Sequence, residues 1–195
     1  MNLANKITVA RIMLIPIFIL FFPLFPSWLI QKSIVFQHID SYGLYYAAAV
    51  FVIASATDKL DGYIARKYNL ITNMGKLLDP LADKLLISAA LILLVSQHLI
   101  YAWIALVIIA REIIITGIRI VASAQKIALQ ADQFGKIKMV AQVIAITAVL
   151  LNNGPIRLAN EIPIDQMLMY AALMMTVFSG INYIRNNYHA LKLHS

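Results

Sequence analysis

Six long apolar runs, separated by short polar stretches, account for most of this sequence. They cover roughly residues 8–29, 42–60, 77–97, 99–122, 137–153 and 164–185. Most of them are close to the ~20 residues that a helix needs to cross a bilayer. Hydrophobic residues make up 62% of the chain and charged residues 13%, about half of the ~25% found in soluble domains. We therefore expect an all-α integral membrane protein with six transmembrane helices, forming one domain over residues 1–195.

The lysines and arginines predict how these helices are threaded. With six spans, nearly all of the 16 basic residues fall at or near one face of the membrane, and only Lys32 and Arg157 fall at the other. The cytoplasmic ends of membrane helices carry such an excess of basic residues. We therefore expect a multi-pass protein of the plasma membrane, with both termini and the polar residues between the second and third runs facing the cytoplasm.

The net charge of +7 raises the question of a nucleic-acid partner. The basic residues stand at the ends of apolar runs and do not form a stripe interleaved with aromatic residues, as a nucleic-acid surface usually does. Basic helix ends instead suit anionic lipids and anionic substrates. The charge distribution therefore predicts membrane lipids as partners and no nucleic acid.

Four of the nine acidic residues lie in one stretch, residues 58–83, "DKLDGYIARKYNLITNMGKLLDPLAD". Asp58 and Asp61 are one helical turn apart near the end of the second run, and Asp79 and Asp83 are one turn apart at the start of the third. Facing carboxylates repel one another, and a divalent cation relieves that repulsion. Because the chain has no cysteine and these ligands are all oxygen atoms, Mg²⁺, Mn²⁺ or Ca²⁺ is favoured over zinc.

The same aspartates are also compatible with solvated helix ends that pair with Lys59, Arg66 and Lys84. Gly62 and Ala65 favour the metal site, because small side chains on the carboxylate face leave room for a bulky substrate. Arg66 beside them can neutralise a phosphate, and ionisable residues within membrane segments are functional by default. We therefore expect a metal site that receives a phosphorylated substrate.

This stretch resembles the signature of the CDP-alcohol phosphotransferase family, D-x2-D-G-x2-A-R-x8-G-x3-D-x3-D, at every specified position and without a gap. Members of the family are six-span membrane enzymes, usually dimeric, that transfer a substituted phosphate from a CDP-linked donor to an alcohol and release CMP. The resemblance implies a homodimer with two divalent cations, Mg²⁺ or Mn²⁺, on the four aspartates. It implies that Asp83 is also the base that deprotonates the acceptor hydroxyl. It further implies a donor site formed by Asp58, Gly62, Ala65, Arg66 and Gly75.

Charged residues in the fourth and fifth runs bear on the acceptor. Arg111, Glu112 and Arg119 lie inside the fourth run, where a centrally placed arginine costs roughly 2.5–3.5 kcal/mol. Lys136 and Lys138 open the fifth run on the same side as Arg119. These cations can form a pocket for an acceptor that carries its own phosphate. The alternatives are a structural pairing of Glu112 with a basic residue of another helix, snorkelling of Arg119, and ordinary positive-inside lysines.

Both runs resemble one bacterial branch of the family, whose members make phosphatidylglycerol phosphate from CDP-diacylglycerol and glycerol 3-phosphate. The R-E-x3-[ST]-G-x-R-x2-A run of that branch is intact at residues 111–122, and its G-K-x-K-T-x2-Q run has Met139 in place of threonine. Its N-x2-T-x2-R opening is matched near the N-terminus. The resemblance implies that Arg111, Arg119, Lys136 and Lys138 bind the acceptor phosphate, with support from Asn5, Thr8, Arg11 and Glu112.

Other functions share parts of these features. A cardiolipin synthase or a phosphatidylinositol-phosphate synthase would use the same donor site with another acceptor. An intramembrane aromatic prenyltransferase also binds a diphosphate through metal-bound aspartates, but such enzymes have longer chains and lack the D-G-x2-A-R element. A cation channel or transporter would leave Gly62, Ala65 and Arg66 unexplained. The sequence therefore favours a phosphatidyltransferase that uses CDP-diacylglycerol and glycerol 3-phosphate.

Overall fold

The computed structural model is all-helical in the residues that it describes, which are 3–67, 73–125, 127, 129–130, 134–152 and 163–192. Side chains are described for residues 9–57, 82, 84–125, 127, 129–130, 134–151 and 163–188. The helices are α1 (Leu3–Leu20), α2 (Ser27–Lys32), α3 (Ile34–Lys67), α4 (Asn73–Ser96), α5 (Ala102–Ala124), α6 (Phe134–Asn152) and α7 (Ile164–Lys192). The predicted all-α class is confirmed.

Each predicted apolar run overlaps one of the long helices, but the first run is not one continuous helix. α1 ends at Leu20, residues 21–26 are not helical, and the short helix α2 follows. Pro23 and Pro26 account for the break, because proline lacks a backbone donor and disfavours a helical conformation in the residue before it. The expected end of the first span at residue 29 is therefore wrong.

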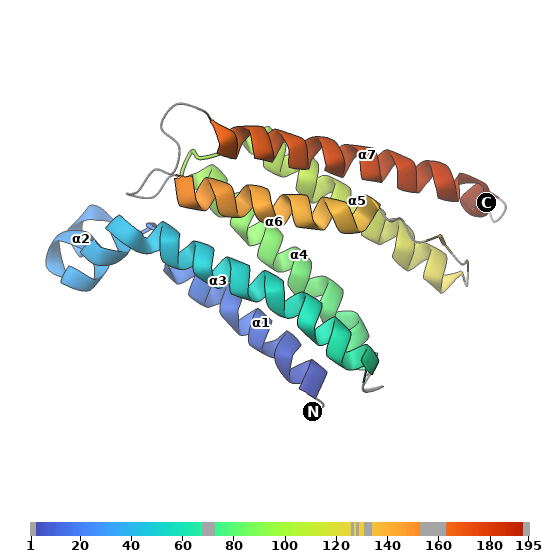
Figure 1. Ribbon diagram of the computed structural model, residues 1–195, viewed down its shortest axis with the longest axis horizontal. Helices are drawn as coiled ribbons and strands as arrows, with labels where there is room; N and C mark the ends of the chain where they lie inside the picture. Colours follow the sequence, from blue (N-terminus) through green and yellow to red (C-terminus); the bar gives the residue numbers. More distant parts are fainter. Residues whose placement is uncertain are drawn as a thin grey trace.

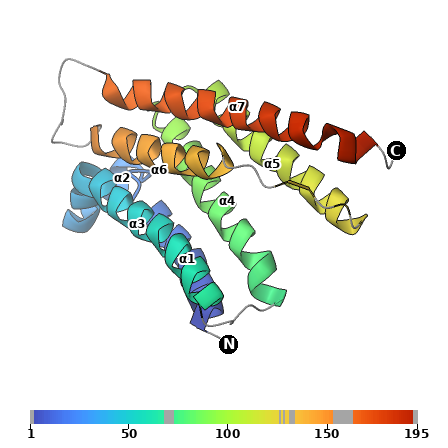
Figure 2. The ribbon, with the colours of Figure 1, turned by 45° about the vertical axis from the view of Figure 1, so that its right-hand side comes forward.

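The long helices form two groups that share a common core (Figure 1). α1 packs against α3 and α4, and α7 packs against α5 and α6. Contacts of α3 with α6, and of α4 with α5 and α6, join the two groups. Figures 1 and 2 show both termini at the same end of the molecule as the end of α3 and the start of α4. We call this the aspartate end, because these parts of α3 and α4 carry Asp58, Asp61, Asp79 and Asp83.

Small side chains let the helices approach one another closely. Fully buried alanines lie on five of the helices, α3 to α7, and small residues at helix–helix contacts are typical of membrane proteins. Gly43 of α3 shows the tightest approach, because a Cβ atom there would collide with the carbonyl oxygen of Phe21. The break after α1 therefore packs directly on α3, beside an aromatic cluster in which the Phe18 ring lies 5.3 Å from Phe22 and 5.9 Å from Phe51.

The outer surface of the described helices is apolar, as expected of a membrane protein. Large side chains such as Leu106 and Met174 are exposed. Among the described residues, Ile34–Thr57, Phe134–Leu151 and Ile164–Tyr188 are long and apolar enough to cross a membrane. Val9–Leu20 and Lys84–Ser96 are shorter apolar helices, and α5 interrupts its apolar sequence with three charged residues. Six spans and cytoplasmic termini stay predictions.

Candidate functional site

The aspartate-rich stretch forms the two helical arms that its spacing predicts. α3 continues to Lys67, so Asp58 and Asp61 lie one turn apart on its last turns. α4 begins at Asn73, so Asp79 and Asp83 lie one turn apart on its first turns. α3 and α4 contact each other, which places two pairs of aspartates on adjoining helices. The side chains of the four aspartates, and those of Gly62, Ala65, Arg66 and Gly75, lie outside the described residues.

The donor atoms of this hairpin fit a hard divalent cation. Four carboxylates on two adjoining helix ends supply oxygen ligands alone, which is the ligand set that Mg²⁺ and Mn²⁺ prefer. Among the side chains that the structure describes, no group of three or more His, Cys, Asp or Glu could hold a metal ion.

A buried ion cluster joins α5 to α6 through the carboxylate of Glu112. The Lys138 ammonium of α6 donates to Glu112 Oε1. Arg111 Nη1 donates to the same oxygen over 3.2 Å. The side chains are 4% exposed for Lys138, 13% for Arg111 and 16% for Glu112. The alternative in which Glu112 pairs with a lysine of another helix is thus the arrangement observed, and it brings three predicted site residues together.

α7 supplies the surface on which Arg111 lies. Arg111 Nη2 donates to Ser179 Oγ at 2.9 Å. A Cβ atom at Gly180 would lie 3.2 Å from Arg111 Cγ and 3.4 Å from its Nε, so glycine leaves the space that the arginine stem occupies. Arg111 Nε is buried and has no hydrogen-bond partner in the described part of the chain. The guanidinium is therefore held at Nη1 and Nη2, and its Nε keeps an unused donor.

Arg119 lies two turns beyond Glu112 on α5 and is held by Tyr183 of α7. Its Nε donates to the Tyr183 hydroxyl at 3.2 Å, and its guanidinium carbon lies 4.9 Å from the centre of the ring. Tyr183 is 2% exposed, whereas Arg119 is exposed. A guanidinium on an aromatic face at this distance gains a cation–π attraction. Arg119 therefore does more than extend its charge towards the membrane surface, because an aromatic residue of another helix holds its guanidinium in place.

A contact between α4 and α5 connects the ion cluster to the aspartate hairpin. Lys84, the residue after Asp83, donates to Thr116 Oγ1 of α5. The Thr116 hydroxyl donates in turn to the backbone carbonyl oxygen of Glu112, at 2.6 Å. α4, which carries Asp83, is thus joined to α5, which carries the two arginines, at a point next to both the aspartate hairpin and the ion cluster. Together they make one candidate site at the aspartate end.

The remaining predicted residues lie around this site. Lys136 is exposed in the first turn of α6, close in sequence to Lys138. Arg11 is 1% exposed on α1, which packs against the two helices of the aspartate hairpin. The side chains of Asn5 and Thr8 lie outside the described residues.

Three residues that hold the arginines, Ser179, Gly180 and Tyr183, were not predicted from the sequence. A signal for them exists in the spacing of α7. Thr176, Ser179, Tyr183 and Asn187 recur every three or four positions, so they share one face of α7. Each of them bonds to α5, to α6 or to the segment between these helices. A polar stripe of this kind on a membrane helix indicates a packed, functional face.

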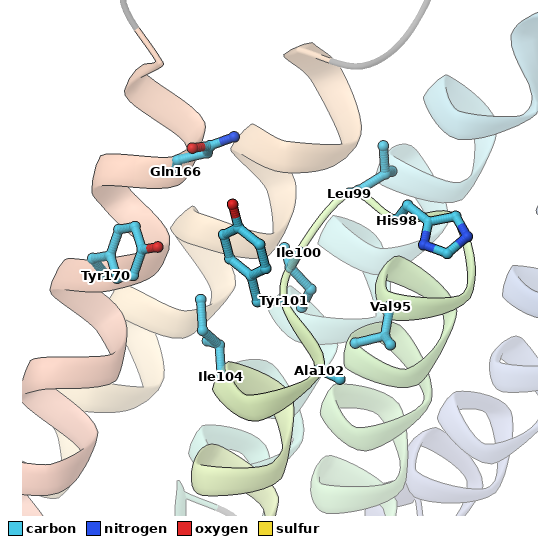
Figure 3. Close-up of a pocket in the computed structure, with 9 residues that line it drawn as sticks. All are labelled: Val95, His98, Leu99, Ile100, Tyr101, Ala102, Ile104, Gln166 and Tyr170. Carbon is cyan, nitrogen blue, oxygen red and sulfur yellow. The ribbon is translucent and has the colours of Figure 1, made fainter.

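A cavity of about 420 Å³ lies at the end of α4 and the starts of α5 and α7, at the opposite end of the bundle from the aspartate hairpin. Figure 3 shows Tyr101 at the start of α5 beside Gln166 and Tyr170 of α7, with apolar side chains below them. Among the described residues that line it there is no lysine, arginine, aspartate or glutamate.

Comparison with known proteins is consistent with the geometry. The sequence model of a family described as CDP-alcohol phosphatidyltransferase matches residues 1–178. A CDP-diacylglycerol–glycerol-3-phosphate 3-phosphatidyltransferase of Bacillus subtilis is 47% identical over 98% of this chain and 97% of its own. A protein of the same description from Rickettsia felis is 34% identical over 94% of each chain. A probable phosphatidylglycerophosphate synthase of Mycobacterium tuberculosis is 34% identical over 94% of this chain and 80% of its own.

Proposed function

This chain belongs to the CDP-alcohol phosphatidyltransferase family, and on that premise we propose that it transfers the phosphatidyl group of CDP-diacylglycerol to glycerol 3-phosphate. The products are phosphatidylglycerol phosphate and CMP, in the synthesis of anionic phospholipids. The observation that carries this proposal is the link from Lys84 to Thr116, which joins the helix of the proposed base to a cluster of cations. Relatives named for this reaction, alike over nearly their whole length, support the same acceptor.

The aspartate hairpin is the proposed donor and metal site. Asp58, Asp61, Asp79 and Asp83 would hold two divalent cations, Mg²⁺ or Mn²⁺, and the donor would lie against Asp58, Gly62, Ala65, Arg66 and Gly75. When bound, the cations neutralise the diphosphate of the donor and the charge that develops on its leaving oxygen. The two helical arms, each with a pair of aspartates one turn apart, support this assignment.

Asp83 is the proposed base of the transfer step. Its carboxylate takes the proton of the acceptor hydroxyl, and the resulting oxygen attacks the β-phosphorus of CDP-diacylglycerol. The bond from this phosphorus to the bridging oxygen breaks, and CMP leaves with that oxygen and its electron pair. A base on a helix is held more precisely than a base on a loop. The contact of the neighbouring Lys84 with α5 supports a fixed position for this part of α4.

The cations of α5 and α6 are the proposed site for the acceptor phosphate. Arg119 and Lys136 are exposed and can meet a charged acceptor that arrives from water. Arg111 and Lys138 lie deeper and are paired with Glu112, so the carboxylate holds both side chains in place. Arginine suits this task because its planar fork matches two phosphate oxygens.

The setting of the site is also part of the proposal. The protein would be a homodimer in the plasma membrane, with the aspartate end facing the cytoplasm. Glycerol 3-phosphate, which is water-soluble, would reach this end from the cytoplasm, and CDP-diacylglycerol would reach it from the membrane. The excess of basic residues at this end supports the orientation. Both termini lie at the same end as the hairpin (Figure 2), as an even number of spans requires.

The proposed function is tested with purified protein in detergent, given labelled CDP-diacylglycerol, Mg²⁺ and one acceptor at a time. Glycerol 3-phosphate should yield phosphatidylglycerol phosphate and one CMP per product. Inositol phosphate and phosphatidylglycerol should yield no product. If either of those is used in preference, the acceptor is wrong. If no acceptor releases CMP, the transferase proposal is wrong.

Arg119→Gln is expected to raise the KM for glycerol 3-phosphate and to leave the KM for CDP-diacylglycerol unchanged. The variant keeps most of the side-chain length but removes the charge, and a hydrogen bond to a charged group contributes ~1.5–3 kcal/mol, which is roughly ten- to hundredfold in KM. Part of the loss should appear in kcat, because a loosely held acceptor rarely aligns its hydroxyl with the donor. Steady-state kinetics with each substrate varied in turn measure both effects.

Lys32→Gln is the matched control, because it also removes one exposed positive charge but lies on α2, away from the aspartate end. It should leave both KM values unchanged. An unchanged acceptor KM in well-folded Arg119→Gln protein would remove this arginine from the acceptor site. It would also weaken the choice of glycerol 3-phosphate.

A further inference from the structure

We propose that Tyr183 of α7 is a positioning residue for the acceptor, because it holds Arg119 in the orientation that presents its terminal nitrogens to a phosphate. The inference rests on the proposed function, since it takes Arg119 to bind the acceptor. It adds a residue of the last helix that lies outside the family match at residues 1–178.

Two contacts fix the guanidinium of Arg119. Nε donates to the Tyr183 hydroxyl at 3.2 Å, and the guanidinium carbon lies 4.9 Å from the centre of the ring. The contact with the ring face and the hydrogen bond to the hydroxyl restrict the guanidinium at two different points. Together they select one orientation for a long side chain that otherwise samples many rotamers.

The orientation leaves the useful donors free for a ligand. A guanidinium has five N–H groups, and the bond to Tyr183 uses the one on Nε. No residue in the described part of the chain bonds to Nη1 or Nη2 of Arg119. These two nitrogens form the fork that binds two oxygens of one phosphate. Arg119 is exposed, so a phosphate can reach them.

Tyr183 is itself rigidly held, as a positioning residue must be. Its side chain is 2% exposed, and Asn187, one turn further along α7, donates to its backbone carbonyl oxygen at 2.9 Å. One turn earlier, Ser179 bonds to Arg111. One face of α7 therefore orients both arginines of α5. Orienting a binding group before the ligand arrives lowers the entropy that binding must lose.

The experiment is a double-mutant cycle of Tyr183 and Arg119, read as the KM for glycerol 3-phosphate at saturating CDP-diacylglycerol and Mg²⁺. Tyr183→Leu removes the ring and the hydroxyl, and it should raise this KM about tenfold, as expected for loss of a cation–π contact together with a charged hydrogen bond. Tyr183→Phe keeps the ring and should raise it less, by about threefold, because the lost hydrogen bond acts on the acceptor only through Arg119. The KM for CDP-diacylglycerol should not change in either variant.

The decisive measurement is made in the Arg119→Gln background. If Tyr183 acts through Arg119, then adding Tyr183→Leu to Arg119→Gln should raise the acceptor KM no further, because the two changes remove the same interaction. A residue that merely fills space would change both backgrounds equally, so additive effects overturn the proposal. An unchanged acceptor KM in folded Tyr183→Leu protein also overturns it.

Two controls keep the result readable. Tyr170→Leu removes a tyrosine from the same helix at the opposite end and should leave the acceptor KM unchanged. If Tyr183→Leu does not fold, as judged by size-exclusion chromatography, the same cycle with Tyr183→Phe decides. Wild-type protein that makes no product from glycerol 3-phosphate defeats both proposals. Active wild-type protein with an acceptor KM that does not respond to Tyr183 variants defeats this one alone.

Discussion

Asp83→Asn is expected to abolish phosphatidyl transfer while leaving the binding of CDP-diacylglycerol in place. Asparagine keeps the size of the side chain and one oxygen, but it cannot accept the proton of the acceptor hydroxyl. Loss of a general base costs about 10²- to 10⁴-fold in rate, and one weakened metal ligand adds to this loss. CMP release measures the rate, and equilibrium binding of labelled CDP-diacylglycerol to the purified variant measures the retained donor site.

Asp79→Asn is the matched comparison, because this aspartate lies one turn earlier on α4 and is assigned to metal binding alone. Loss of Asp79 should weaken metal binding, so excess Mg²⁺ should restore part of the turnover of Asp79→Asn. Excess Mg²⁺ should not restore the turnover of Asp83→Asn. Excess EDTA should stop the wild-type enzyme. Turnover of Asp83→Asn near the wild-type rate would show that the base is another residue, and full turnover in EDTA would end the metal proposal.

The helices of the donor site could be predicted from sequence because their signal is local. Asp58 and Asp61, and Asp79 and Asp83, recur at helical spacing inside apolar runs, so both the helix type and the shared face follow from neighbouring residues. The structure confirms this part at the level of the backbone, with α3 continuing through the first pair and α4 beginning before the second. Whether the four side chains hold metal stays a prediction.

The sequence signal for the break after α1 is also local, but the prediction from hydropathy missed it. Hydropathy continues across residues 21–26, so an average over a window of about 20 residues does not register the change. Pro23 and Pro26 carry the signal, because each proline ends the hydrogen-bonding pattern of the helix before it. The proline at position 16, by contrast, lies inside α1, so a single proline in the run was not sufficient to locate the break.

The partners of the charged residues could not be read from spacing. Glu112 and Lys138 are 26 positions apart, and Arg119 and Tyr183 are 64 apart. Helical periodicity shows which residues share a face of one helix, but not which face of another helix they meet. From the positive-inside pattern, Lys138 could be either a solvated residue at the membrane surface or part of a buried site. In the structure α6 packs on α7 and α3, and the Lys138 side chain is 4% exposed. Tertiary packing therefore decides between the two interpretations.

Glu112→Leu is expected to lower the free energy of unfolding by about 3 kcal/mol, which is the low end of the range for removing one partner of a buried ion pair. The low end applies because Glu112 is 16% exposed. The variant takes the carboxylate away from both Lys138 and Arg111. Lys138→Met should cost less, because Glu112 then keeps its ion pair with Arg111. Thermal unfolding of the purified proteins in one detergent measures the order.

The double variant Glu112→Leu/Lys138→Met separates stability from function. Apolar residues of similar volume often replace a buried ion pair at little cost, so the double variant should be more stable than Glu112→Leu alone. Its KM for glycerol 3-phosphate should nevertheless be higher than that of the wild-type protein, because the pocket has lost Lys138 and the carboxylate that holds Arg111. Asp40→Leu, which removes an exposed carboxylate from α3 far from the cluster, is the control for the loss of a charge. If Lys138→Met proved more damaging to stability than Glu112→Leu, then Glu112 would not be the centre of this cluster, and the shared carboxylate would not be what holds the two cations together.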